Sequence, residues 1–439
     1  MARVSRVLQS YKELINNSID DVEIFYSNLK DDDGKLKEFL SVFSTVEDSR
    51  IKKKCKYTTM TIVGIVFLGL ICGMDTWKEF AAFAKKKKDI VGKYVDLSNG
   101  IPSHDTLMRV FSLINSVTLE DALVGFLQKN IEATSRAPEL VKEGEMGHIA
   151  MDGKEEHGTG RKYGTDEKVK NAQIMNFYDS STGVCIRSEL IDKKTNEIAT
   201  AQTILKSLNI KKMIITSDAM NCQKKTVEVI KDGEAHYVLG LKENHSDFYN
   251  EVMDKFNKKT KYGSKSYYKA ETEKNHNQVE IREFYKIKSN EFVFADEWKG
   301  IKNVVMYKKT MTNNITHEEK QEQRYYITDL DDLKLIADAI RRHWAVENEL
   351  HWHLDASLNE DDNSTMNRRA AANLSIMRKN VLTLLKLMQP VLGNYSIKTT
   401  KKLFALNFEE TIIKLFVFLD EKNMSQLLTI TKKQNKNSD

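Results

Sequence analysis

Two aspartates follow short apolar runs and have the surroundings of metal ligands. Asp152 comes directly after HIAM at 148–151 and precedes Gly153, and Asp218 comes directly after MIITS at 213–217. Polar residues at the ends of neighbouring strands meet at one edge of an open sheet. Two carboxylates at such an edge repel each other, and burying them is costly without a cation. Since hard cations such as Mg²⁺ prefer carboxylate oxygens, we expect Asp152 and Asp218 to bind a divalent metal.

The third ligand is expected to be Glu347, in RRHWAVENELHW. Helical spacing places this glutamate on a stripe of otherwise apolar residues that would face the sheet, namely Leu333, Ile336, Ala337, Ile340 and Trp344. A carboxylate on such a stripe is expensive to bury unless it is paired. Glu349 points about 200° away at 3.6 residues per turn, so we expect it to be solvated.

The two aspartates also have purely structural explanations. Asp-Gly after a strand is most often a turn, which would account for Asp152 and Gly153. Asp218 would serve equally well as the cap of a helix that begins near Cys222.

Glu347 has two alternative explanations of its own. It could pair with a basic residue, such as Arg341, Arg342 or Lys379. With His343 and His351 it shares a helix face at steps of four residues, which is also a zinc-binding geometry. The chain has no HExxH motif, so the zinc alternative is the weaker one.

The composition sets broad limits. The 439 residues suffice for two or three domains, and 68 Lys and Arg against 63 Asp and Glu are compatible with nucleic-acid binding without arguing for it. Lysine runs at 52–54, 85–88 and 211–212 are either phosphate contacts or solvated faces. The four cysteines form no CxxC pair, which is typical of a reducing cytoplasm, and the N-terminus has no apolar leader. The apolar run 60–74 is shorter than the roughly 20 residues of a membrane span, so we expect a buried core helix.

Hydrophobic periodicity predicts how the chain is organised. Residues 1–140 have helical spacing, with Ser103 as a helix cap. From residue 147 onward, short strands alternate with amphipathic helices, which indicates a mixed α/β sheet. Residues 262–328 contain four β-type segments and are expected to form an inserted antiparallel lobe. The other predicted strands are 147–152, 171–179, 183–191, 211–219 and 235–241.

Beyond these patterns, the chain resembles the DDE transposases of bacterial insertion sequences, and in particular the branch that includes the H-repeat-associated transposase-like proteins. The similarity is carried, in order, by NGIPSHDTLMRVF, MDGK, DKKTNEI, IITSDAMNCQK, YVLGLKENH, HNQVEIRE, RHWAVENELHWHLDASLNEDDN and AANLSIMRKN. These segments run from about residue 40 to 385, which is most of the chain. The resemblance implies that Asp152, Asp218 and Glu347 are the acidic triad of the active site.

The resemblance also implies a domain organisation. A helical associated and DNA-binding domain is expected at 1–140, and an RNase H-like catalytic domain at 145–385, within which 262–328 is the inserted lobe. A C-terminal helical segment with a polar tail is expected at 386–439.

The chemistry implied is metal-dependent phosphoryl transfer on DNA. The triad would hold two Mg²⁺ or Mn²⁺ ions, cleave DNA at the ends of the insertion sequence and join the new 3′-hydroxyl to target DNA. The alternatives are a metal-dependent nuclease that cuts without joining, and a non-catalytic DNA-binding relic. The expected partners are double-stranded terminal inverted repeats and target DNA, with a homodimer in the synaptic complex, no membrane, and a cytoplasmic, nucleoid-associated location.

Several residues near the triad are candidate DNA contacts: Lys154, Lys242, Asn244, Arg341, His343, Trp344 and Asn348. Lys242 and Asn244 are equally typical of a polar helix start, and Trp344 of a core. Better-known relatives carry Tyr, Arg and Lys around the glutamate, where this chain has Ile340, His343 and Leu354. His343 is therefore a candidate to take over the arginine's contact with phosphate, with a charge that titrates.

Overall fold

The structure is a computed structural model. It describes residues 34–135, 146–160, 171–180, 183–191, 197–259, 261, 263–264, 266–270, 272–275, 278–388, 395–409, 411–412 and 415. The helical prediction for 1–33 and the polar tail lie outside these residues. Within residues 34–135 the predicted helical character is confirmed.

The N-terminal region is a group of helices built around one apolar helix. Its helices are α3 (Gly34–Ser41), α4 (Thr59–Ile71), α5 (Trp77–Lys86), α6 (Lys88–Val91), α7 (His104–Phe111) and α8 (Ser116–Ser135). The predicted cap Ser103 is confirmed, because its side chain accepts a hydrogen bond from the Thr106 amide at 3.3 Å.

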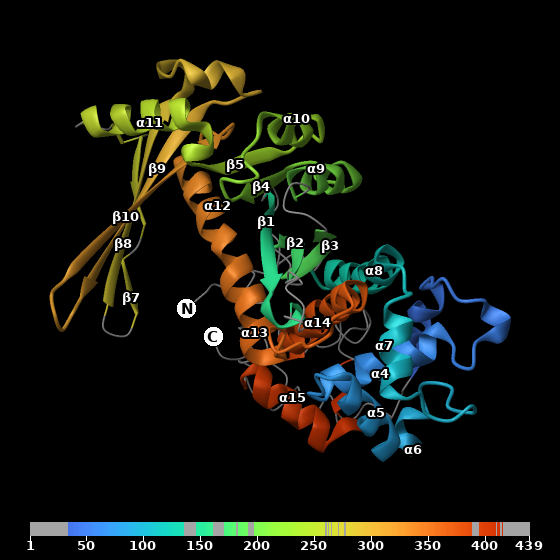
Figure 1. Cartoon of the computed structure of the whole chain (residues 1–439). Helices are drawn as coiled ribbons and strands as arrows, with labels where there is room; N and C mark the ends of the chain where they lie inside the picture. Colours follow the sequence, from blue (N-terminus) through green and yellow to red (C-terminus); the bar gives the residue numbers. More distant parts are fainter. Residues whose placement is uncertain are drawn as a thin grey trace, which may run out of the picture.

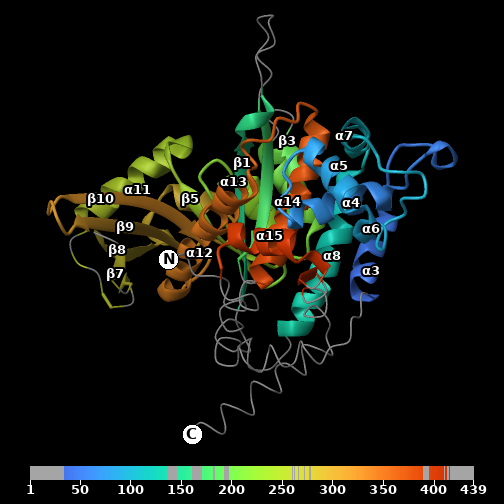
Figure 2. The same cartoon turned by 90° about the horizontal axis from the view of Figure 1, so that it is seen from below.

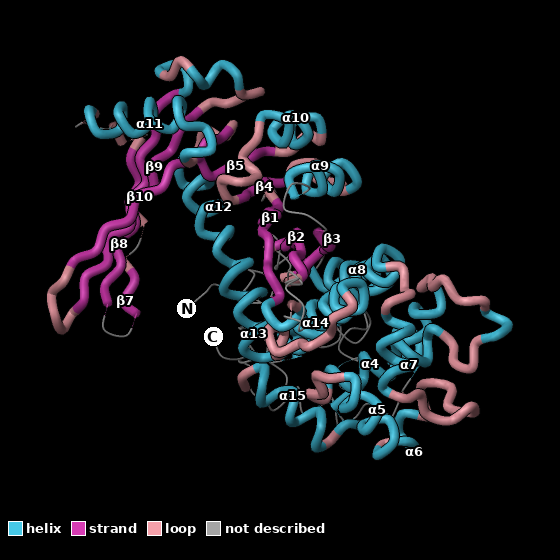
Figure 3. Tube along the Cα trace, in the orientation of Figure 1, coloured by secondary structure: helices cyan, strands magenta, loops and turns pink. Residues whose placement is uncertain are grey.

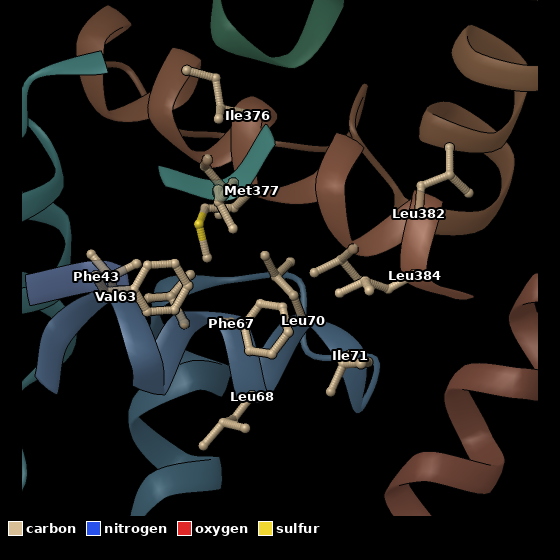
Figure 4. Close-up of a cluster of buried hydrophobic side chains, with 14 of the residues drawn as sticks. Phe43, Val63, Phe67, Leu68, Leu70, Ile71, Ile376, Met377, Leu382 and Leu384 are labelled. Atoms are coloured by element: carbon tan, nitrogen blue, oxygen red, sulfur yellow. The ribbon is translucent and has the colours of Figure 1, made fainter. Parts of the chain in front are cut away.

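The apolar run is a core helix, as predicted. Every residue of α4 from Thr61 to Ile71 is buried, and Figure 4 shows Val63, Phe67 and Leu70 lying toward Met377 of the C-terminal helix α14 (Arg368–Met388). Searching the described residues for a helix with the length and apolarity of a membrane span finds none.

The centre of the molecule is a ten-stranded mixed sheet, which confirms the predicted mixed α/β class. Its strands are β1 (Gly147–Glu156), β2 (Ala172–Asp179), β3 (Val184–Ile191), β4 (Met213–Ser217), β5 (His236–Leu241), β6 (Tyr267–Lys269), β7 (Glu273–Asn275), β8 (Gln278–Lys288), β9 (Asn303–Asn313) and β10 (Glu319–Thr328). Their order is β3-β2-β1-β4-β5-β10-β9-β8-β6, and β7 pairs with β8. The central strands β1, β4 and β5 are parallel, and every other pairing is antiparallel.

The β-type segments predicted in 262–328 are strands, and they continue this sheet instead of forming a sheet of their own. Residues Tyr325–Thr328 of β10 pair with β5, whereas β10 pairs with β9 along its whole length. As a result β8, β9 and β10 run on beyond β5 as a long ribbon (Figures 1 and 3). Figure 2 shows this ribbon and the N-terminal helices on opposite sides of β1.

Helices cover the two faces of the sheet. Side chains of α9 (Glu197–Ser207), α10 (Lys224–Asp232) and α11 (Ser246–Lys258) share a core with Ile149 and Met151. On the other face, α12 (Leu333–Ala345) packs on Ile214 and Val238. Alternation along β1 separates its two faces, as predicted, because Ala150 belongs to the core of the N-terminal helices and α14, whereas Ile149 and Met151 belong to the core under α9, α10 and α11. We call the face under α12 the α12 face.

The chain after α12 passes through a π-helical turn (Val346–His351) into α13 (Trp352–Leu358), followed by α14 and α15 (Ile397–Leu406). Helix α14 contacts both the sheet, at β2 and β3, and the N-terminal helices α4, α7 and α8. It therefore joins the N-terminal helices to the sheet.

Candidate active site

Asp152 lies within β1, so the predicted strand end and turn are wrong. Strand β1 continues to Glu156 because β2 pairs with it from Ile149 to Glu156, with Asp152 opposite Asn176. The pairing of β1 with β4, in contrast, stops at Met151 opposite Ser217. Asp152 is therefore the first residue of β1 beyond the end of β4, where the sheet edge opens.

Gly153 follows Asp152 for a packing reason. A Cβ atom at Gly153 would lie 3.1 Å from Oε1 of Glu197, a buried residue at the start of α9. Glu197 is a fourth acid beside the site, and its charge helps to raise the pKa of Asp152. Sequence reasoning missed it because only the chain's return through α9 brings it to β1.

Asp218 directly follows β4 and occupies a tight turn. Its Oδ1 accepts hydrogen bonds from the amide and the side chain of Asn221 at 3.5 and 3.4 Å. Helix α10 begins at Lys224 with Gln223 as its cap, so the explanation of Asp218 as a helix cap is wrong. The register of Met151 with Ser217 makes Asp152 and Asp218 the next residues on two adjacent parallel strands. This confirms that the two aspartates meet at one sheet edge.

A glycine on the next strand leaves room for the Asp218 turn. A Cβ atom at Gly240 of β5 would lie 3.3 Å from the Ala219 amide nitrogen and 3.5 Å from the Asp218 carbonyl carbon. Asn244, after β5, donates a hydrogen bond to the Ala219 carbonyl at 2.8 Å. Strand β5 thus packs against the turn at Gly240, and Asn244 after β5 holds the turn by a hydrogen bond.

Glu347 lies at the start of the π-helical turn, and its predicted burial on an apolar stripe is wrong. The stripe is buried from Leu333 to Ile340, but Glu347 is exposed. The Trp352 amide donates to the Glu347 carbonyl, an i→i+5 bond that changes the helical phase from the value of 3.6 residues per turn. Single π turns of this kind are frequent at functional sites.

The same turn buries Glu349, which contradicts the predicted solvation of that residue. Glu349 is 6% exposed and accepts a hydrogen bond from the Tyr178 hydroxyl of β2 at 3.1 Å. The Lys386 ammonium of α14 lies 4.0 Å from its carboxylate. Glu349 therefore anchors the turn to β2 and α14, while Glu347 is left at the open edge.

The basic residues proposed as alternative partners of Glu347 bind elsewhere. Arg341 pairs with Glu273, Arg342 pairs with Asp338 at 2.9 Å, and Lys379 donates to Ser188 at 3.1 Å. Within the described part of the chain, Glu347 takes part in no ion pair.

The three acids influence one another electrostatically. Burial, followed by the charges of Asp218 and Glu347, raises the pKa of Asp152 to about 7. Partial desolvation of the Glu347 carboxylate, although the residue as a whole is exposed, also raises its pKa, against the opposing charge of Arg324. Excess negative charge at this edge fits a divalent cation held by oxygen ligands. As the side chains stand, the described residues contain no set of three His, Cys, Asp or Glu side chains at metal-binding distances, and carboxylates without a cation repel one another.

His351 is directed at Asp152 and not at a zinc site. Asn176 of β2 lies with its amide nitrogen 3.2 Å from His351 Nε2, so the imidazole accepts there. Its Nδ1–H then faces Asp152, with 3.5 Å between Nδ1 and Oδ2. Burial lowers the pKa of His351 to about 3, so the ring is neutral at pH 7. His351 thus orients Asp152, and the residue that fixes its tautomer is the one opposite Asp152 on β2.

A buried chain of hydrogen bonds ties together the three elements that carry the acids. Thr216 Oγ1 of β4 lies 3.1 Å from His148 Nε2 of β1 and 3.0 Å from His343 Nδ1 of α12. His148 Nδ1 lies 2.7 Å from the Ser180 hydroxyl. Burial lowers the pKa of His343 to about 4. The His343 ring is thus neutral at pH 7 and bonded to the sheet, which argues against the prediction that it supplies a cation to phosphate.

Lys154, a predicted DNA contact, is occupied by protein carboxylates. Its buried ammonium lies 2.7 Å from Asp355 and 3.3 Å from both Glu360 and Asp361, a group that we call the Lys154 cluster. A buried lysine charge requires such partners, so this position favours a structural role for Lys154 over the predicted contact with DNA.

The other predicted DNA contacts differ in how free they are. Lys242, Asn244 and Asn348 are exposed. Arg341 is paired with Glu273 of β7. Trp344 is half-buried outside the cores, and the Arg324 guanidinium lies 4.2 Å from its ring centroid. Arg324 was missed from the sequence, because its position beside α12 depends on the pairing of β10 with β5.

Two family models match consecutive parts of the chain. Residues 143–384 match the family model described as the transposase DDE domain, and residues 40–127 match the model of its associated domain. The candidate transposase YncI of Escherichia coli O157:H7 is 31% identical over 85% of this chain and 93% of its own length. The H repeat-associated candidate transposase YhhI of Escherichia coli K12 is 29% identical over 80% of this chain and 91% of its own length.

A solved piggyBac transposase in a synaptic complex with hairpin DNA aligns with a TM-score of 0.36 and 10% identity, covering 89% of this chain and 79% of that one. The family model alone spans more than half of the chain and includes all three acids. The chain therefore belongs to the DDE-domain transposases, enzymes that act on DNA.

Proposed function

We propose that this transposase cleaves DNA at insertion-sequence ends and transfers the strand to target DNA through Asp152, Asp218 and Glu347. The observation that carries the proposal is the register of Met151 with Ser217, which sets the two aspartates side by side where the sheet edge opens. The exposed position of Glu347 on a π turn and the raised pKa of Asp152 support it.

The triad would hold two Mg²⁺ or Mn²⁺ ions. Bound there, the ions would polarise the scissile phosphate and activate the attacking water or 3′-hydroxyl. The protein's own contribution is positioning. Adjacent strands fix the aspartates, His351 orients Asp152, and the chain of His148, Thr216 and His343 keeps the three elements in place.

The architecture supports an RNase H-like core. The strand order β3-β2-β1-β4-β5, with β1 to β3 antiparallel and β1, β4 and β5 parallel, is what we assign to that core. We propose the catalytic domain at 145–385, with a DNA-binding helical domain at 1–140 and a C-terminal segment at 386–439. The lysine runs at 52–54 and 85–88 would contribute salt-dependent affinity for terminal inverted repeats.

The DNA contacts nearest the acids would be Lys242, Asn244, Trp344 and Asn348. Two chains would join in the synaptic complex, since two transposon ends are brought together, and the enzyme would act in the cytoplasm at the nucleoid. A nuclease that cuts without joining is the alternative. A precut transposon end offered with target DNA separates the two, because only a transposase yields joined product.

The neighbouring glutamates of the π turn provide a matched test. In Glu347→Gln we expect Mg²⁺-dependent cleavage of end-containing DNA to fall about 10³-fold or more, with stability within about 0.5 kcal/mol because the side chain is exposed. In Glu349→Gln we expect cleavage to persist and stability to fall by about 1–3 kcal/mol. Equal cleavage by both variants would remove Glu347 from the active site.

A further inference from the structure

The sheet edge that carries the two aspartates is negatively charged there and positively charged on the neighbouring strands β5 and β10. Ser217 of β4 pairs with Leu239 of β5, and Leu241 at the end of β5 pairs with Tyr325 of β10. Because β10 runs antiparallel to β5, Lys242 and Arg324 are the next residues on these two strands and occupy neighbouring positions. The edge therefore places two acids on β1 and β4 beside two bases on β5 and β10.

All four residues lie on the α12 face. Val238 and Tyr326 belong to the core under α12, and alternate residues of a strand share a face. Arg324 is two residues from Tyr326, and Lys242 is four residues from Val238 with an extended backbone (φ −142°, ψ −169°). Gly240, which lies between Val238 and Lys242 in this alternation, carries no side chain, and the backbone of the Asp218 turn packs against it there.

Arg324 lies beside the helix that leads to the glutamate of the triad. Its guanidinium lies 4.2 Å from the Trp344 ring centroid, and its Nε pairs with Glu322. Trp344 precedes Glu347 by three residues on the same helix, and the charge of Arg324 acts on Glu347. Stacking on an indole leaves the edge of a guanidinium available for a planar, two-point contact with phosphate.

On α12, the ring of His343 is bonded to Thr216 of the sheet. We propose that Arg324, stacked on Trp344, and Lys242 form the phosphate-binding end of the active site and hold the backbone of the DNA strand whose scissile phosphate lies at the acids. This inference rests on the proposed function. It places the phosphate-binding arginine on β10 rather than on α12, and it makes Trp344 a support for Arg324.

The test measures binding of a precut transposon-end duplex by the full chain carrying Glu347→Gln, so that cleavage does not interfere. We expect Arg324→Gln and Lys242→Gln each to weaken binding about 10-fold at moderate salt and to reduce the slope of log K against log salt by about one. Lys288→Gln, at the opposite end of the sheet and paired with Asp331, is the charge-matched control and should leave both quantities unchanged. Arg324→Lys should keep the salt slope.

A second readout separates a structural role from a phosphate contact. If Arg324→Gln lowers the unfolding temperature but leaves the salt slope of the parent, the inference is overturned and Arg324 merely packs on Trp344. The proposed function is tested separately, in the chain with Glu347 intact, by Mg²⁺-dependent cleavage. If the chain with Glu347 intact cleaves DNA but the Arg324 and Lys242 variants keep the parental salt slope, only the inference is contradicted. If these variants reduce the salt slope but the intact chain does not cleave, only the catalytic proposal is contradicted.

Discussion

Two groups of charged side chains lie on the same face of β1, one around Lys154 and one around Asp152, two residues apart. They differ in whether the protein itself supplies the cation that balances their acids. In the Lys154 cluster, a buried lysine lies within 3.3 Å of three acids. At Asp152, the neighbouring charges are those of Asp218 and Glu347, and the contacting imidazole of His351 is neutral at pH 7. Over the described residues, no lysine or arginine forms an ion pair with any of the three acids.

The difference separates a structural group from a functional one. A buried charge pair that the protein completes by itself contributes to the fold when it is whole and destabilises the fold when one partner is removed. Acids left without a protein cation cost stability, and they persist in a fold where an external cation or substrate uses them. The two groups should therefore respond to mutation in opposite ways.

The largest expected effect is on activity, at the uncompensated group. Asp152→Asn should reduce Mg²⁺-dependent cleavage about 10³-fold or more, because an amide neither carries the charge nor binds the ion as tightly. In metal-free buffer the same variant should be more stable than the parent. Cleavage assays and thermal unfolding on one preparation check both effects, and residual cleavage near the parental level would contradict the assignment.

The stability gained by Asp152→Asn in metal-free buffer should depend on pH, because the pKa of Asp152 is shifted in the folded protein. That pKa is about 7 in the folded protein and 3.8 ordinarily, so the folded state holds the proton more tightly and stability falls as pH rises from about 4 to 7. The loss amounts to at most about 4 kcal/mol. The variant should lack it, and Mg²⁺ should stabilise the parent more at pH 8 than at pH 5. A parent whose stability curve matches that of the variant at every pH would contradict this account.

The next effect is on stability, at the compensated group. Lys154→Met should lower the free energy of unfolding by about 3–5 kcal/mol, because Glu360, with 0% exposure, loses its ammonium partner. Adding Glu360→Gln should recover part of this loss, since the uncompensated charge is then removed. Urea unfolding of the two variants provides the measurement. A single variant as stable as the parent would show that the cluster is dispensable.

Much of the site could be predicted from the sequence because it is local. The apolar runs before Asp152 and Asp218 and their alternation specify the strands and the shared edge without reference to distant residues. The side of the helix on which Glu347 lies could not be predicted. It depends on the π turn, which accompanies the burial of Glu349 against Tyr178 and Lys386, and helical periodicity does not indicate those contacts.

The remaining errors have the same origin. Lys154 reads as a free cation, since its partners lie 201 to 207 residues away in the chain. Arg324 has no visible signal, because its place beside Glu347 requires β10 to pair with β5. The predicted inserted lobe was recognised as strands but not as part of the same sheet, for that reason.

An intermediate effect is expected where hydrogen bonds join the three elements of the site. Thr216→Val keeps the shape of the side chain but removes the hydroxyl shared by His148 and His343. It should cost about 1–3 kcal/mol and reduce cleavage about 10-fold through looser placement of the acids. Thr203→Val, whose hydroxyl bonds to its own helix at Ala199, is the matched control. Equal losses in the two variants would show that the hydrogen-bonded chain has no special part in the site.

The smallest effect is expected beneath the Asp218 turn. Gly240→Ala would place a methyl group 3.3 Å from the Ala219 amide, so the turn must shift by a few tenths of an ångström. Cleavage should fall several-fold while stability changes by less than about 1 kcal/mol. Gly125→Ala, where a Cβ has open space, should change neither quantity. Unaltered cleavage in Gly240→Ala would mean that the turn tolerates displacement.

The most direct test of the central claim is the location of bound metal. Crystals of the full chain with a precut transposon-end duplex and Mn²⁺ would show the ions by anomalous diffraction. The account predicts ion density enclosed by Asp152, Asp218 and Glu347, with a DNA phosphate in contact. Ions bound only elsewhere, such as at the exposed acids of the Lys154 cluster, with the three carboxylates apart in the presence of DNA, would contradict it.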